Sequence, residues 1–240
     1  MITLISDLHT HTTFSHGKGS PEQNISAAIK RGLKQVGISD HSVRHLFYGI
    51  RDINRYYDEL MQLKENYSSM IDVKAGIELN IISDKGDFDM PDRYLDMFDF
   101  VILGFHKGAA PKDFASLFDM FIGRNIKRLS DRHLKAFDMA LASGKIDILA
   151  HPGYAISSDR FELAKICEKH GVVYEINNKH KELTSEEITR ISCGTGVNFL
   201  ISTDAHVPGD VGLPLHALEI AEKASLDPKR IINSDVFSND

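Results

Sequence analysis

Short apolar runs recur along the chain and alternate with longer segments whose apolar residues repeat every three or four positions. The short runs have the length and the branched side chains of buried strands, and the longer segments have the period of amphipathic helices. Seven strands are expected, at Ile2–Ser6, Gln35–Ser39, Val73–Ile77, Phe98–Gly104, Ile146–Ala150, Val172–Ile176 and Val197–Ser202. This alternation predicts parallel βα units in an α/β protein.

Capping residues locate the helices between these strands. The first helix should begin after Ser20, with Pro21 in its first turn and Gln23 closing a capping box, and end at Gly32. A second capping box is expected over Thr184–Glu187. Further helices are expected at Arg51–Tyr67, Lys127–Ser143, Arg160–His170, Ser185–Cys193 and Pro214–Ser225, with a hairpin turn between Ile81 and Phe88 and an extra short helix or lid at Phe114–Ile122.

Length and charge limit the classes of protein to consider. The 240 residues are 42% hydrophobic and contain no linker-like stretch, so we expect a single domain over residues 1–240. The formal net charge of −6 argues against an extended basic surface for long nucleic acid and favours a small substrate. Neither a secretory leader nor a membrane-spanning stretch is evident, which predicts a soluble, cytoplasmic protein with no membrane partner.

Side chains that bind metals follow six of the seven expected strands. They are Asp7, His9, His11 and His16 after the first, Asp40 and His41 after the second, Glu78 after the third, His106 after the fourth, His151 after the fifth, and Asp204 and His206 after the seventh; the sixth is followed by Asn177 and Asn178. In a closed parallel barrel these ends lie on one face, where such barrels place their active sites. Burying so many imidazoles and carboxylates there without a cation would be costly, so the pattern predicts a metal site.

Other polar residues have a plainer interpretation. A single buried histidine is more often a hydrogen-bonded core residue than a metal ligand. We therefore interpret the histidines that do not follow a strand as structural, namely His45, His133, His170, His180 and His216, and the run Lys179–Lys181 as a solvated loop. Asn177 and Asn178 could contact substrate or satisfy local backbone groups.

The motifs DLHTH, SDH, GIE, a single His106, AHPG and STDAH, in this order from Asp7 to His206, resemble the PHP family, named for polymerase and histidinol phosphatase. The chain is most similar to the small stand-alone phosphoesterases and histidinol-phosphatase-like members. The resemblance implies a distorted (β/α)7 TIM-like barrel with the metal site at the C-terminal ends of the strands, in agreement with the seven strands expected from the apolar pattern.

The resemblance also implies three divalent metal ions, usually Zn²⁺ and alternatively Mn²⁺ or Fe. The first would be held by His9, His11, Glu78 and Asp204, the second by Glu78, His106 and His151, and the third by His16, His41 and His206. We assign catalysis to Glu78, Asp204 and His206. Asp7 and Asp40 are expected to accept hydrogen bonds from ligand imidazoles.

The resemblance implies hydrolysis of a small phosphate monoester by metal-activated hydroxide. Neither Ser nor Cys stands in a nucleophile-elbow context, which favours direct hydrolysis without a covalent phosphoenzyme. Histidinol phosphate is the first candidate substrate. Lys18, Lys107 and Arg160 are expected either to bind the phosphate or to face solvent. A phosphodiesterase or nuclease, and a metal-binding module without enzymatic activity, stay open as alternatives, and the sequence does not define the oligomeric state.

Overall fold

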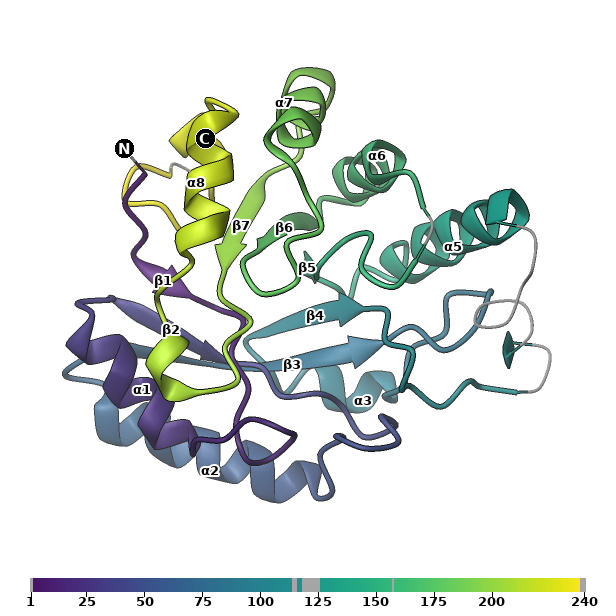
Figure 1. Ribbon diagram of the computed structural model, residues 1–240. Helices are drawn as coiled ribbons and strands as arrows, with labels where there is room; N and C mark the ends of the chain where they lie inside the picture. The colour runs from purple at the N-terminus through teal and green to yellow at the C-terminus, as the bar shows by residue number, and fades with distance from the viewer. Residues whose placement is uncertain (1, 114–115, 118–125, 157, 238–240) are drawn as a thin grey trace.

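Seven parallel strands form one sheet whose order follows the chain. The computed structural model describes residues 2–113, 116–117, 126–156 and 158–237. Its strands are β1 (Ser6–Asp7), β2 (Gln35–Ile38), β3 (Asp72–Asn80), β4 (Phe100–Gly104), β5 (Ile148–Leu149), β6 (Val173–Asn177) and β7 (Phe199–Ser202). The expected α/β class with seven parallel strands is therefore confirmed, and the sheet curves into a nearly closed barrel (Figure 1).

The helices cover the outside of the barrel (Figure 1). They are α1 (Pro21–Lys30), α2 (Ile53–Tyr67), α3 (Asp92–Leu95), α5 (Ile126–Leu141), α6 (Arg160–His170), α7 (Ser185–Gly194) and α8 (Leu215–Lys223), with 3-10 turns η2 (Pro208–Asp210) and η3 (Pro228–Arg230). Both predicted capping boxes are present, at the starts of α1 and α7. The predicted turn is confirmed by an antiparallel bridge between Ile81 and Phe88. Most of the expected element at Phe114–Ile122 lies outside the described residues.

The first strand is shorter than expected because the residues before it pair elsewhere. Leu4 forms an antiparallel bridge with Ser234 near the other end of the chain. The seam between β1 and β7 is spanned by the buried side chain of Asn233, whose amide donates to the carbonyls of Ser6 and Ile201, both at 2.8 Å, and accepts from the Ile201 N–H at 3.2 Å. The C-terminal segment thus links the two edge strands.

The core has an outer layer between strands and helices and an inner layer within the barrel. Along β4, Val101 and Leu103 belong to the large outer cluster, whereas Phe100 and Ile102 belong to a smaller cluster of inward-facing residues. A Cβ atom at Gly76 would lie 2.3 Å from the Phe100 ring, so this glycine leaves the space that the ring fills. Within the described residues, none of the helices has both the length and the apolar composition needed to span a membrane.

Candidate metal centre

The predicted ligands come together where the strands end. His9 and His11 follow β1, Glu78 lies near the end of β3, and Asp204 follows β7; all four side chains are buried. Because the strands are parallel and each pairs with its chain neighbours, residues far apart in sequence share this face of the barrel. The other predicted ligands, His16, His41, His106, His151 and His206, lie among them.

Glu78 is at the centre of the group. Its Oε2 lies 2.6 Å from Nδ1 of His41 and 3.5 Å from Nε2 of His11. Its Oε1 lies 3.0 Å from Nε2 of His151 and 3.4 Å from Nε2 of His106. The two oxygens of one carboxylate therefore face two different sets of imidazoles, which is the arrangement required of a ligand shared by two metal ions.

The two oxygens of Asp204 also face different imidazoles. Its Oδ1 lies 3.3 Å from Nε2 of His11 and 3.3 Å from Nδ1 of His206, while its Oδ2 lies 3.1 Å from Nε2 of His180. The backbone φ is 52° at Asp204 and 30° at His151, a left-handed conformation that costs free energy for residues other than glycine. The fold holds both side chains in place at this cost.

The imidazoles of His16, His41 and His206 pack together beside the carboxylates. The ring centre of His16 lies 4.0 Å from that of His206 and 5.0 Å from that of His41. The described residues form four groups of three in which one donor atom from each member lies within 4.8 Å of the other two. These groups are His9, His11 and Asp204; His11, His41 and His206; His41, Glu78 and His106; and His151, His180 and Asp204. His16 is next to the second group, in which His11 joins His41 and His206.

The donor atoms fit divalent metal ions. Nδ1 of His41 and Oε2 of Glu78 approach to 2.6 Å, yet neither atom has a hydrogen bond of acceptable geometry among the described residues. The Nε2 atoms of His9 and His11 face each other at 3.1 Å. Buried polar atoms without partners are costly, and a shared cation would relieve that cost. Mixed imidazole and carboxylate donors suit Zn²⁺, and also Mn²⁺ and Fe.

The surroundings lower the pKa of both ligand carboxylates and of four ligand imidazoles, those of His11, His16, His106 and His206, whereas nearby carboxylates raise the pKa of His9 and His151 against the effect of burial. Burial opposes ionisation of Glu78, but the imidazoles of His41, His106 and His9 outweigh it and hold the pKa well below its usual value. Burial and the nearby His206 lower the pKa of His16 to about 3. Burial likewise lowers the pKa of His206 to about 4. At neutral pH these rings keep a free lone pair, as a metal ligand must.

Glu175 and Asn80 orient two of the imidazoles, and sequence reasoning did not identify either. Oε1 of Glu175 accepts a hydrogen bond from Nδ1 of His9 at 2.6 Å, and Oδ1 of Asn80 accepts one from Nδ1 of His106 at 2.7 Å. Each bond fixes the tautomer that leaves Nε2 free toward Glu78. One feature of the sequence could have identified Glu175: it is a single acidic residue within an otherwise apolar strand segment.

Asp7 and Asp40 do not have the hydrogen bonds expected of them. Asp7 accepts from Thr203 and from the N–H of Gly212, while Asp40 accepts from Thr12 and from the hydroxyl of Ser15. The expectation that these carboxylates bind ligand imidazoles is therefore corrected. Backbone and hydroxyl donors of the ligand loops lie closer to them than any ring nitrogen, so the two aspartates brace the loops that carry the ligands.

A cavity of about 770 Å³ opens directly over the ligands. Its described lining is His16, His41, His45, Phe47, Tyr48, His106, Lys107, Gly108, Tyr154, Ala155, Lys179, His180 and Asp204. His45, Lys179 and His180 are thus part of the site, which corrects their interpretation as residues outside it. Nζ of Lys179 lies 3.4 Å from Oδ1 of Asp204 and 2.9 Å from Nδ1 of His206.

The three basic residues expected near phosphate have different positions. Lys107 lines the cavity, whereas Lys18 is exposed and not among the described lining residues. Arg160, at the start of α6, forms a 2.7 Å ion pair with Glu187. Asn177 and Asn178 both satisfy backbone groups: Asn177 accepts from the N–H groups of residues 179 and 180, and Asn178 accepts from those of residues 216 and 217.

Comparison with known proteins identifies relatives of this architecture. The model of the PHP domain family matches residues 7–186. A protein named "probable phosphatase" from Thermoanaerobacter sp. (strain X514) is 29% identical over 97% of this chain and 91% of its own length. Another of that name, from Shewanella piezotolerans, is 28% identical over 96% of this chain and 89% of its own length.

A solved structure has the same fold. The crystal structure of histidinol phosphate phosphatase from Lactococcus lactis, complexed with Zn, L-histidinol and phosphate, superposes with a TM-score of 0.66. It is 17% identical, and the match covers 94% of this chain and 95% of that chain. At this identity the likeness concerns the fold.

Proposed function

This chain belongs to the PHP domain family, and on that premise we propose that it is a metal-dependent phosphatase acting on a small phosphate monoester. One observation carries the proposal: the two oxygens of the buried Glu78 carboxylate face two separate sets of imidazoles. A carboxylate placed in this way is suited to bridge two metal ions at the floor of a substrate-sized cavity. The Zn-bound phosphatase of the same fold and the relatives named as phosphatases support it.

The ligand residues divide among three ions in this proposal. His9, His11, Glu78 and Asp204 would hold the first, Glu78, His106 and His151 the second, and His16, His41 and His206 the third. When bound, these ions would supply a hydroxide nucleophile from water and neutralise charge on the phosphate. Among these ligands, Glu78, Asp204 and His206 would be the catalytic residues.

The protein contributes orientation and charge around that centre. Glu175 holds the imidazole of His9 in one tautomer, and Asn80 does the same for His106. Lys107 and Lys179 place two positive charges on the cavity wall, where they would attract a phosphate dianion. Lys179 now contacts Asp204 and His206, and a cation bound to those ligands would repel its ammonium group toward the cavity.

Removal of the metal tests this function. Protein stripped with a chelator, with metal loss verified by elemental analysis, should lose hydrolysis of 4-nitrophenyl phosphate and regain it when Zn²⁺ or Mn²⁺ is added. Metal present at about 100 times its dissociation constant stabilises a fold by about 2.7 kcal/mol, so the melting temperature should fall by roughly 5–10 °C on removal. Undiminished hydrolysis without metal would refute the proposal.

Two control measurements separate the alternatives. Histidinol phosphate is the first natural substrate to test, because a phosphatase of this fold was crystallised with L-histidinol and phosphate. Faster cleavage of bis(4-nitrophenyl) phosphate or of single-stranded DNA than of the monoester would indicate a phosphodiesterase or nuclease instead. Full metal content without turnover of any phosphate ester would indicate a binding module.

A further inference from the structure

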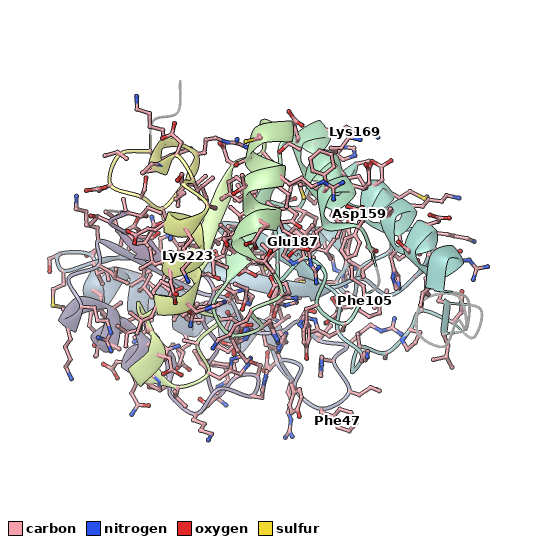
Figure 2. All side chains as sticks on the ribbon, turned by 45° about the horizontal axis from the view of Figure 1, so that its top comes forward. Phe47, Phe105, Asp159, Lys169, Glu187 and Lys223 are labelled. Carbon is pink, nitrogen blue, oxygen red and sulfur yellow. The ribbon has the colours of Figure 1, made fainter. Side chains whose placement is uncertain are left out.

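Three aromatic side chains stand exposed around the mouth of the cavity. Phe47 is 76% exposed, Tyr48 42% and Tyr154 39%, and all three belong to its described lining. Figure 2 shows Phe47 at the margin of the molecule, pointing away from the ribbon. Exposed rings lose the favourable free energy that burial would give, so a group of them at one opening indicates a surface that another group covers.

The segment that carries two of these rings is held in place. Its backbone pairs with the segment after β4: the N–H of Leu46 donates to Gly108 at 2.9 Å, and the N–H of Ala110 donates to Arg44 at 3.0 Å. The Tyr48 ring stacks on that of His16 with centres 4.2 Å apart. The backbone of this segment and the Tyr48 ring are therefore held before any ligand arrives, so a bound ring would cover this surface at a reduced cost in conformational entropy.

Tyr154 is fixed in a similar way from another part of the chain. Its ring lies 3.7 Å, centre to centre, from the imidazole of His180, at an angle of 32°. His180 in turn lies 3.1 Å from Oδ2 of Asp204. Aromatic surface therefore continues from the rim to the predicted ligands, and a substrate with its phosphate at the metals would place its leaving group among these rings.

The charges on the cavity wall restrict the leaving group further. Lys107 and Lys179 are cationic, and Asp204 is the one carboxylate among the described lining residues. That carboxylate is already within 3.3 Å of His11 and 3.4 Å of Lys179. An ammonium group on the substrate would meet two positive side chains and no available carboxylate, whereas a neutral or anionic group would meet no repulsion.

From this aromatic rim and its charges, we propose that the cavity selects phosphate monoesters whose leaving group is a flat ring without positive charge. The inference rests on the proposed phosphatase activity and narrows its substrate class. It ranks an aromatic ester that is neutral or carries a second negative group above histidinol phosphate, whose amine is protonated at neutral pH. Phe47, Tyr154 and Lys107 are the residues that would determine this specificity.

Matched substrates test the ring preference. Benzyl phosphate and cyclohexylmethyl phosphate have leaving alcohols of similar size and basicity, and they differ in whether the ring is flat. The Zn-loaded enzyme should prefer benzyl phosphate about 3- to 10-fold in kcat/KM, the range expected for an aromatic contact. Phe47→Leu and Tyr154→Leu should reduce the preference at unchanged metal content. Tyr67→Leu is the control, because Tyr67 is partly buried at the end of α2 and is not among the described lining residues, and it should retain the preference.

A second pair of substrates tests the charge preference. 4-Carboxybenzyl phosphate should be a better substrate than 4-(aminomethyl)benzyl phosphate. Lys107→Met should reduce that ratio about 3-fold, since a partly exposed charge contributes modestly. Lys74→Met is the matched control, because Lys74 pairs with Asp72 at the opposite end of β3 and should leave the ratio unchanged.

The outcomes separate this inference from the function on which it rests. Equal rates for flat and saturated rings, or a preference for the aminomethyl ester, would overturn the inference while the protein remained a phosphatase. A ring preference that survives both Phe47→Leu and Tyr154→Leu would overturn the assignment to these residues. Failure to hydrolyse any of the esters in the metal-loaded state would overturn the phosphatase proposal itself.

Discussion

Replacing Glu175 by Gln should weaken metal binding although Glu175 is not a proposed ligand. The buried carboxylate accepts four hydrogen bonds: from Nδ1 of His9 at 2.6 Å, the Ser202 hydroxyl at 2.6 Å, the His151 N–H at 2.5 Å and the Asn177 amide at 3.0 Å. Glutamine keeps one acceptor oxygen and turns the other position into a donor. Two of these four donors would then face an NH₂ group.

The size of the effect follows from what the carboxylate does for His9. As an ionised acceptor, the carboxylate makes the ring more basic and fixes Nδ1 as the protonated nitrogen. Nε2 is then the nitrogen whose lone pair can bind a metal ion. Loss of such a partner typically costs 10- to 100-fold in metal affinity. This corresponds to about 1.4–2.8 kcal/mol of binding free energy. Hydrolysis at limiting Zn²⁺ should fall in proportion and recover partly when Zn²⁺ is in excess.

Competition with a chromophoric chelator measures the affinity, and two matched variants interpret it. Asp7→Asn removes another buried carboxylate of the same barrel end, which binds Thr203 and Gly212 instead of an imidazole. Ser202→Ala removes a second donor to the same oxygen of Glu175. Both should lower thermal stability and change the affinity for Zn²⁺ less than 3-fold. If Asp7→Asn weakens Zn²⁺ binding as much as Glu175→Gln does, the role assigned to Glu175 is wrong.

Three further predictions concern stability and stoichiometry. His16→Ala should release one of three metal ions while sparing the other two, and elemental analysis showing no loss would contradict a three-metal site. Burial raises the pKa of Glu182 to about 8, so the stability it contributes is complete below about 4.5 and is lost as pH rises towards 8. In urea unfolding, the free energy of unfolding of Glu182→Gln should therefore rise relative to that of the wild type between pH 5 and 8, by at most about 1.4 kcal/mol per pH unit. Parallel stability profiles of the two proteins over this pH range would contradict the raised pKa of Glu182. Asn233→Ala leaves buried backbone groups of Ser6 and Ile201 unpaired and should cost about 3 kcal/mol, which an unchanged melting temperature would contradict.

The sequence predicted most of the strands because their signal is local. β4 reads as a continuous apolar run since both of its faces are buried, one in each layer of the core. The first strand was placed too early for the opposite reason. The apolar residues Ile2, Leu4 and Ile5 would suit a strand beside β2, but Leu4 bridges Ser234, and no local pattern indicates a partner 230 positions away.

The predicted ligands come together because each lies near the end of a strand or in the loop that follows it. Such residues lie within a few positions of a barrel rim, so the fold alone determines where they meet. Asp7 ends β1 and Asp40 follows β2, but their role depends on which donor is nearest. The hydroxyls and N–H groups of Thr12, Ser15 and Thr203 satisfy these carboxylates, and that competition depends on loop geometry that spacing does not encode.

Residues of the loops were missed for a related reason, and the difference bears on function. His45 reaches the cavity because its segment bridges to Ala109, and the segment 179–180 is held by the side chain of Asn177. The first contact joins loops that are distant in sequence, and the second is a tight turn whose position over the cavity depends on how the loop folds. Strand ends place the predicted metal ligands and loops place the wall that a leaving group would touch, so a family match extends to metal chemistry more securely than to the substrate. The substrate must therefore be sought in the loops of this chain, where Phe47, Tyr154 and Lys107 stand.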